Sequence, residues 1–92
     1  MSKQLVDVGV WMYPSDALNE AIQDAENAAN ETHKSPHRRG PHIMYVLLAR
    51  RENRYYGPVN EHKRNSLVYS SMEIAYTANP LKEVSDDQTR SL

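Results

Sequence analysis

The sequence has no cysteine, no phenylalanine and only three glycines among its 92 residues. Without cysteine, a disulfide framework, a thiolate zinc site and a cysteine nucleophile are all excluded. The glycines are isolated from one another, so there is no glycine-rich phosphate loop. No charged leader precedes an apolar stretch, and the longest strongly apolar run covers only residues 43–49. These absences predict a cytoplasmic chain without a secretion signal or a membrane span.

Large apolar side chains are also scarce, so six tyrosines, four methionines and one tryptophan must fill much of the interior. A chain of this length supports one hydrophobic core. We expect residues 1–80 to form a single domain. Residues 81–92 are mostly polar and predict a C-terminal tail that is dispensable for folding.

The net charge of −1 conceals three blocks of opposite sign. Residues 1–31 carry a net charge of −5, residues 32–64 carry +6 together with all four histidines, and residues 65–92 carry −2. This segregation predicts a basic surface that faces a polyanion and is backed by an acidic one. The alternative is that the blocks neutralise one another once the chain folds.

The first half of the chain predicts a strand followed by a helix. Residues 5–13 alternate along one apolar face, which is typical of a strand. Pro14 ends that strand, and Ser15 is a good helix N-cap. Alanine, leucine and isoleucine then recur at helical spacing over residues 16–32, with acids and amides on the opposite side. The acidic side is either a solvated face or a contact for a basic partner.

The second half predicts three strands. Residues 42–50 are apolar on both faces and indicate a central strand. Residues 54–59 predict a return strand, and Gly57-Pro58 indicates that it is either an edge strand or contains a bulge. A polar turn at residues 60–65 leads to a long alternating strand over residues 66–77, with a helix from near Ser71 as the weaker alternative. The prediction is an α+β domain of order β-α-β-β-β, an antiparallel sheet with one amphipathic helix packed on a face.

Neither metal binding nor catalysis is favoured by the remaining polar residues. The histidines are His33, His37, His42 and His62. Lys34, Arg38 and Arg39 lie beside the first three in sequence and would repel a dication, so we predict no metal and no other cofactor. Glu61 and His62 adjoin, but neighbouring side chains of an extended segment point apart. We therefore expect no enzymatic activity.

Partner binding has better support from the basic residues. Arginine outnumbers lysine and suits bidentate recognition of phosphate or carboxylate, while tyrosine can stack on bases. Only Glu52 is close in sequence to the arginines at positions 50, 51 and 54. We expect this basic region, rather than the acidic helix, to make the first contacts with a partner. The candidate binding residues are Arg38, Arg39, Arg50, Arg51, Arg54, Tyr55, Lys63 and Arg64.

An acidic helix at residues 15–31, a basic loop at residues 34–41 and arginine-bearing hairpin turns, in a small chain without cysteine, resemble the phage anti-CRISPR proteins. The layout is most similar to inhibitors of type I, particularly type I-F, surveillance complexes. This resemblance of size and layout implies a non-enzymatic protein that binds Cas subunits near the guide RNA and blocks hybridisation of target DNA. Its partner would be a multi-subunit protein–RNA complex, not a membrane or a small-molecule substrate. The resemblance assigns no role to any individual residue.

Two other functions stay open from the sequence. A small phage or bacterial regulator that binds nucleic acid by itself is the main alternative, because arginines and tyrosines interleave in the basic block. A toxin-like RNase is less favoured, because such toxins are usually strongly basic overall, whereas this chain has a net charge of −1.

Overall fold

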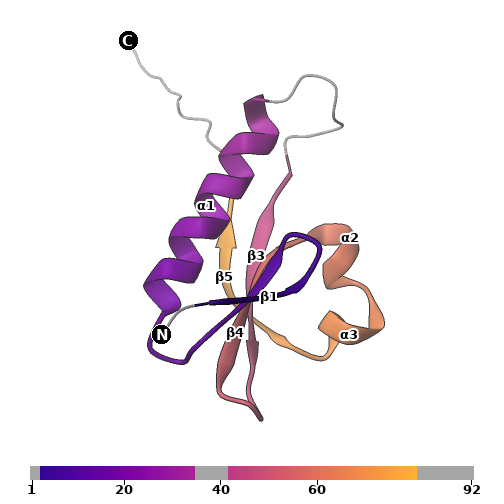
Figure 1. Ribbon diagram of the computed structural model, residues 1–92. Helices are drawn as coiled ribbons and strands as arrows, with labels where there is room; N and C mark the ends of the chain where they lie inside the picture. Colours follow the sequence, from indigo (N-terminus) through magenta and orange to yellow (C-terminus); the bar gives the residue numbers. More distant parts are fainter. Residues whose placement is uncertain (1–2, 35–41, 81–92) are drawn as a thin grey trace.

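The computed structural model describes residues 3–34 and 42–80. Within them, five strands form one sheet in the order β1-β2-β4-β3-β5, and every neighbouring pair is antiparallel. A long helix, α1, packs on one face (Figure 1). The predicted α+β class is therefore confirmed, although the described residues hold one more strand and two more helices than predicted. In chain order the elements are β1 (Gln4–Asp7), β2 (Val10–Tyr13), α1 (Leu18–Lys34), β3 (Met44–Ala49), β4 (Arg54–Asn60), α2 (Glu61–Arg64), α3 (Leu67–Ser70) and β5 (Glu73–Ala78).

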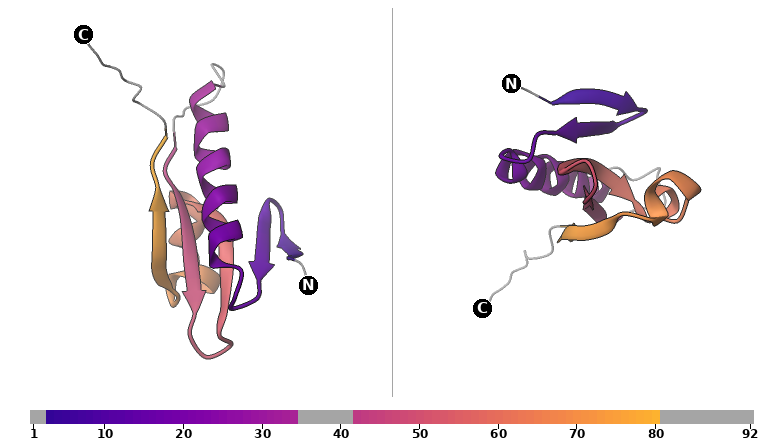
Figure 2. Two further views of the ribbon diagram at one scale, coloured as in Figure 1. Left: turned by 90° about the vertical axis from the view of Figure 1, so that its left-hand side faces the viewer. Right: turned by 90° about the horizontal axis from the view of Figure 1, so that it is seen from below.

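The segment predicted as one strand over residues 5–13 is a hairpin. Its two-residue turn, Val8-Gly9, joins β1 to β2, and Gly9 has a φ of 73°, which glycine adopts without steric cost. The register shifts between Leu5 and Asp7, so Val6 is an extra residue in β1. Figure 2 shows this hairpin beside α1, on the side of the helix away from β5. The sheet therefore curls around the helix.

The predicted helix is confirmed, and it begins at Leu18. Ser15 and Asp16 form a turn before it, in which the Ala17 N–H donates to the Pro14 carbonyl at 3.0 Å, so Ser15 is not the N-cap. Ala21, Ala25 and Ala29 recur every four residues and are completely buried against the sheet. Their small side chains allow the helix axis to approach the strands closely.

The central pair of strands is β3 and β4. The strand predicted as central is β3, which lies between β4 and β5 and has most of its residues buried. β4 pairs with both β2 and β3, so of the two predicted alternatives, an edge strand or a bulge, the bulge is the one present. One extra β4 residue lies between the two residues opposite Tyr45 and Leu47. A Cβ at Gly57 would lie 3.0 Å from the Tyr45 carbonyl oxygen, so this close approach requires glycine.

The segment after β4, residues 61–78, differs most from the prediction. Residues 61–64, predicted as a polar turn, form α2, whose N-cap Asn60 accepts from the Lys63 N–H at 2.8 Å. The long strand predicted over residues 66–77 is α3 followed by β5, and Ser71 ends α3 rather than starting a helix. β5 is an edge strand with one extra residue, Ala75, relative to β3. The sheet thus has α1 on one face and two one-turn helices near the other.

The second core lies on the face away from α1. It consists of Val10, Tyr45, Leu47, Val59 and Tyr69, with Tyr56 and Met72 packed at its margin. Tyr69 comes from α3, so this short helix contributes one large buried side chain. The sheet separates this core from the alanine-lined core under α1.

Candidate interaction surface

Three candidate arginines surround the turn between β3 and β4, and each has a different environment. Arg50 donates from Nε and Nη2 to the two carboxylate oxygens of Glu73, each at 2.8 Å. Arg54 donates from Nη1 to the Met12 sulfur at 3.3 Å. Arg51 is exposed and forms no hydrogen bond or ion pair with any residue that the structure describes. Glu73, 23 residues away in sequence, is the neighbour that the local sequence did not indicate.

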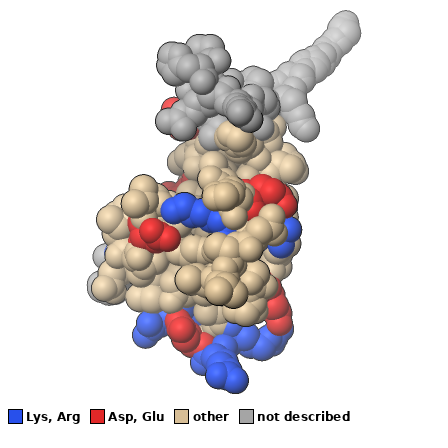
Figure 3. Space-filling view, turned by 90° about the vertical axis from the view of Figure 1, so that its right-hand side faces the viewer, with Lys and Arg blue, Asp and Glu red and all other residues tan. Residues whose placement is uncertain are grey.

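The two candidate residues of α2 are also paired with acids. Lys63 lies 3.7 Å from Asp7, and Arg64 lies 3.4 Å from Glu61 and over the Tyr45 ring at 4.9 Å. Figure 3 shows separate groups of basic side chains with acidic ones beside them, rather than one continuous patch. For the described residues, folding therefore brings the acidic and basic blocks together.

The remaining candidates do not join these groups. Tyr55 is half-buried and packs against the core beneath α1, whereas its neighbour Tyr56 packs against the opposite core. Arg38 and Arg39 lie outside the described residues, as do His37 and the predicted tail at residues 81–92. That the eight candidate residues contact a partner stays a prediction.

Several of the acidic residues in the sequence accept hydrogen bonds from tyrosine hydroxyls. Five phenols donate to carboxylates, and hydrogen bonding together with partial burial raises the pKa of each. Two of the acids, Asp24 and Glu26, come from α1, so the acidic side of this helix also holds the sheet. The pairs are Tyr13–Asp24, Tyr45–Glu61, Tyr56–Glu52, Tyr69–Asp7 and Tyr76–Glu26.

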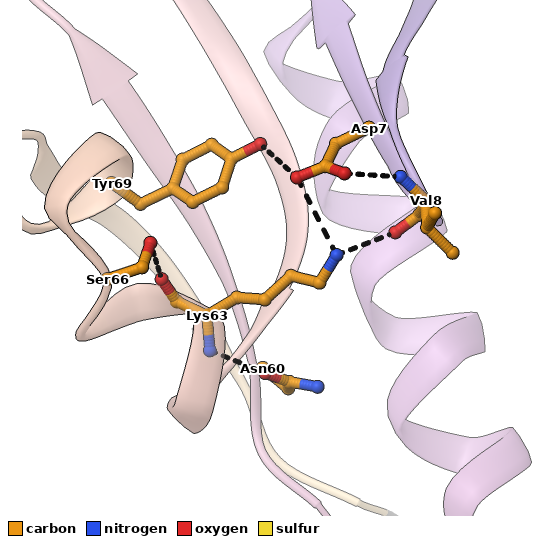
Figure 4. Close-up of polar contacts among 6 residues, drawn as sticks. All are labelled: Asp7, Val8, Asn60, Lys63, Ser66 and Tyr69. Atoms are coloured by element: carbon orange, nitrogen blue, oxygen red, sulfur yellow. Dashed lines mark hydrogen bonds and ion pairs between the residues drawn. The ribbon is translucent and has the colours of Figure 1, made fainter.

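A polar cluster of Asp7, Lys63 and Tyr69 ties the β1–β2 hairpin to α2 and α3 (Figure 4). The Lys63 ammonium donates to the Val8 carbonyl at 3.0 Å, and the Tyr69 hydroxyl donates to the Asp7 carboxylate at 3.3 Å. The hydrogen bond from the Val8 N–H, helped by Lys63 and Tyr69, holds the pKa of Asp7 below its usual range. Ser66 fixes the base of the cluster by donating to the Lys63 carbonyl at 2.7 Å. The cluster therefore sets the position of the hairpin relative to the short helices.

A hollow of about 660 Å³ lies among the residues that this cluster positions. Val6 and Val68 contribute aliphatic side chains that are 43% and 65% exposed. Tyr56, Tyr69 and Met72 supply the more deeply buried part of the lining, and the β3–β4 turn supplies a charged end. The full lining is Val6, Ala49, Arg50, Arg51, Glu52, Tyr56, Val68, Tyr69, Ser71 and Met72.

Sequence reasoning found the charged end of the hollow but missed its apolar lining. The alternating pattern predicts strands at Val6, Val68 and Tyr69, but Val6 is an exposed bulge residue of β1, and Val68 and Tyr69 lie in α3. The available signal was Leu67-Val68, two large aliphatic residues directly after a polar turn. Leu67 is 91% exposed, so these side chains do not contribute to a core as strand residues would.

The chain matches no protein-family model, no curated protein and no solved structure. No helix in residues 3–34 and 42–80 is long and apolar enough to cross a membrane. Over the same residues, histidine, aspartate and glutamate do not gather into a group of three or more that could hold a metal ion. Function is therefore argued from the surface itself.

Proposed function

We propose that this protein is a non-enzymatic binding protein that contacts its partner through the hollow. The observation that carries the proposal is the convergence of exposed Val6 and Val68, from two elements far apart in sequence, on one concave site. Exposed apolar side chains around a hollow are typical of interaction sites, since water contacts them unfavourably.

The polar contacts favour binding over catalysis. Glu61 accepts from Tyr45 at 2.7 Å and from Arg64 at 3.4 Å, so its carboxylate is engaged away from the adjacent His62. Hydrogen bonding by Tyr45 lowers the pKa of Glu61, which makes this carboxylate a weaker base. These contacts of Glu61 with Tyr45 and Arg64 disfavour a role for it as a base acting with His62.

The surface favours a protein partner over direct binding of nucleic acid. Tyr69 is only 5% exposed and Tyr55 packs beneath α1, so neither ring offers the open face that base stacking requires. Arg50, Lys63 and Arg64 already have carboxylate neighbours, which reduces the charge available to phosphates.

In its specific form, the proposal is a phage anti-CRISPR protein that binds Cas subunits of a type I surveillance complex near the guide RNA and blocks target-DNA hybridisation. The resemblance in size and layout supports this choice, and the exposed Arg51 beside an apolar hollow suits a protein surface close to RNA. The alternative, a regulator that binds nucleic acid alone, is an outcome of the same experiment.

The test uses a purified type I-F surveillance complex with its guide RNA and a labelled complementary target DNA. Pre-incubation with the protein is expected to prevent hybridisation, and Val68→Asp is expected to raise the required concentration at least about tenfold. Leu67→Asp is the matched control, because Leu67 is on the same helix and does not line the hollow.

Three outcomes would overturn the proposal in this form. Normal hybridisation in the presence of excess protein would exclude the inhibitor. A shift of free DNA or RNA by the protein alone, with affinity that falls steeply with salt, would favour the regulator. Cleavage of RNA would establish an enzyme.

A further inference from the structure

We infer that the hollow binds an extended segment of a protein in which an acidic residue stands next to large apolar residues. This inference rests on the proposed binding function and specifies the chemistry of the segment that is bound. The apolar part of the hollow, its charged end and its fixed walls each support it.

The apolar part is built to receive large side chains. Val6 is the extra residue of the β1 bulge, and bulges commonly redirect a side chain. Tyr56 and Tyr69 lie with ring centroids 6.4 Å apart and planes tilted by 58°, so together they form a packed aromatic base beneath the exposed Val6 and Val68. Met72 adds an adaptable thioether that can fit more than one apolar shape.

The charged end favours an acid in the bound segment. Arg50 is held by Glu73, and Glu52 accepts from the Tyr56 hydroxyl at 2.8 Å, so both side chains are engaged within the protein. Arg51 lines the hollow and has no such partner among the described residues. Its guanidinium can therefore make a bidentate pair with an incoming carboxylate.

The walls of the hollow are in place before any partner arrives. Lys63 and Tyr69 hold Asp7 and Val8, which follow Val6 directly, so the hairpin and α3 keep a fixed spacing. Binding a segment there then requires ordering of the segment but little rearrangement of this protein. Among the described residues that line the hollow, Arg51 is the cation without an acidic partner, and one such cation suits one carboxylate better than a run of phosphates.

The experiment selects binders from a library of random dodecapeptides with the full chain as bait. The enriched peptides are expected to carry aspartate or glutamate beside leucine, methionine or an aromatic residue. Amide chemical shifts on titration with an enriched peptide are expected to change in β1, α3 and the β3–β4 turn. Enrichment of basic peptides, the absence of enrichment, or shift changes confined to α1 would each overturn the inference.

Charge reversal tests the role of Arg51 directly. Arg51→Glu is expected to weaken binding of the acidic peptide at least about tenfold and to favour a version with lysine in place of its acid. Arg54→Glu makes the same change of charge at the first residue of β4, directly after that turn, where the side chain does not line the hollow, and it is expected to have the smaller effect. Equal weakening by both variants would contradict a specific pair with Arg51.

The two proposals can fail separately. If acidic peptides bind at the hollow but the surveillance complex is not inhibited, the inference stands and the anti-CRISPR function is wrong. If the complex is inhibited without any selected peptide reaching the hollow, the function stands and the inference is wrong.

Discussion

The two faces of the sheet are covered in different ways. On one face, the 17-residue helix α1 packs continuously against the strands through Ala21, Ala25 and Ala29. On the other face, two four-residue helices cover the core only in part, and the hollow lies beside α3, the β3–β4 turn and Val6 of β1. Helices this short are not stable alone and depend on tertiary contacts. The comparison indicates that the α1 face is packed continuously, while the opposite face holds a second core and leaves an exposed hollow beside it.

The largest effect is expected from overfilling the α1 face. Ala25→Leu should lower the free energy of unfolding by about 2–3 kcal/mol, because Ala25 is fully buried between helix and sheet. Thermal unfolding followed by circular dichroism measures this as a fall in melting temperature of about 10 °C or more. Gln23→Leu, at an exposed position of the same helix, should leave the melting temperature nearly unchanged. If the two variants melt together, the α1 face is not tightly packed.

An acid-side dependence of stability is expected from Asp24, which joins α1 to the strands. Partial burial raises the pKa of Asp24, but hydrogen bonds from Lys3 and Tyr13, each at 2.7 Å, outweigh this and bring it below its usual value. A lowered folded-state pKa gives stability that is complete above about pH 4 and is lost as the pH falls through the folded value.

Asp24→Asn should remove about 1 kcal/mol or less at pH 7, since the carboxylate is partly exposed, and should flatten the loss of stability in acid. Urea unfolding between pH 7 and pH 2.5 provides the measurement. Asp16→Asn, at an exposed turn residue, is the control. A variant with the wild-type pH profile would show that Asp24 does not couple folding to protonation.

A smaller, local effect is expected from the cluster that positions the hairpin. Lys63→Met keeps the aliphatic stem but removes the contacts to Val8 and Asp7, so amide exchange in β1 and β2 should accelerate at least about threefold. Arg64→Met is matched in size and position, but its contacts to Glu61 and Tyr45 do not involve the hairpin. Equal exchange rates in both variants would mean that Lys63 does not hold the hairpin.

The smallest change in stability is expected at the hollow itself. Val68→Asp should alter the free energy of unfolding by no more than about 0.5 kcal/mol, because Val68 is 65% exposed and forms no part of either core. Chemical denaturation measures it, with Val59→Asp, a fully buried position, as the contrasting variant expected to unfold. Strong destabilisation by Val68→Asp would move this residue from the binding surface to the core and weaken the comparison of the two faces.

The α1 face could be predicted from the sequence because its signals are long. The alanine spacing extends over several helical turns, and residues 43–49 are apolar without interruption. The opposite face could not be predicted in the same way. A two-residue turn at Val8-Gly9 preserves the alternation of residues 5–13, so a hairpin and a single strand give the same pattern.

The surroundings of the charged candidates could not be predicted for a related reason. Local sequence identifies only neighbours along the chain. Arg50 binds Glu73, which is 23 residues away, and Lys63 lies beside Asp7, which is near the start of the chain. Only the tertiary fold brings these groups together. Arg51 and Arg54 have no acidic partner among the described residues, and their contact with a partner stays a prediction.

At high concentration, we expect the bulge at Ala75 to hinder pairing of other molecules with the edge strand β5. A straight edge strand offers an unbroken row of backbone donors and acceptors on which a strand of another molecule can assemble. The extra residue interrupts that row after Ile74, and the Arg50–Glu73 pair puts charge at its beginning. A strand of another molecule that paired alongside β5 would have to begin on a kinked and charged edge. We therefore expect assembly of crowded molecules through β5, an edge strand of the described sheet, to be disfavoured.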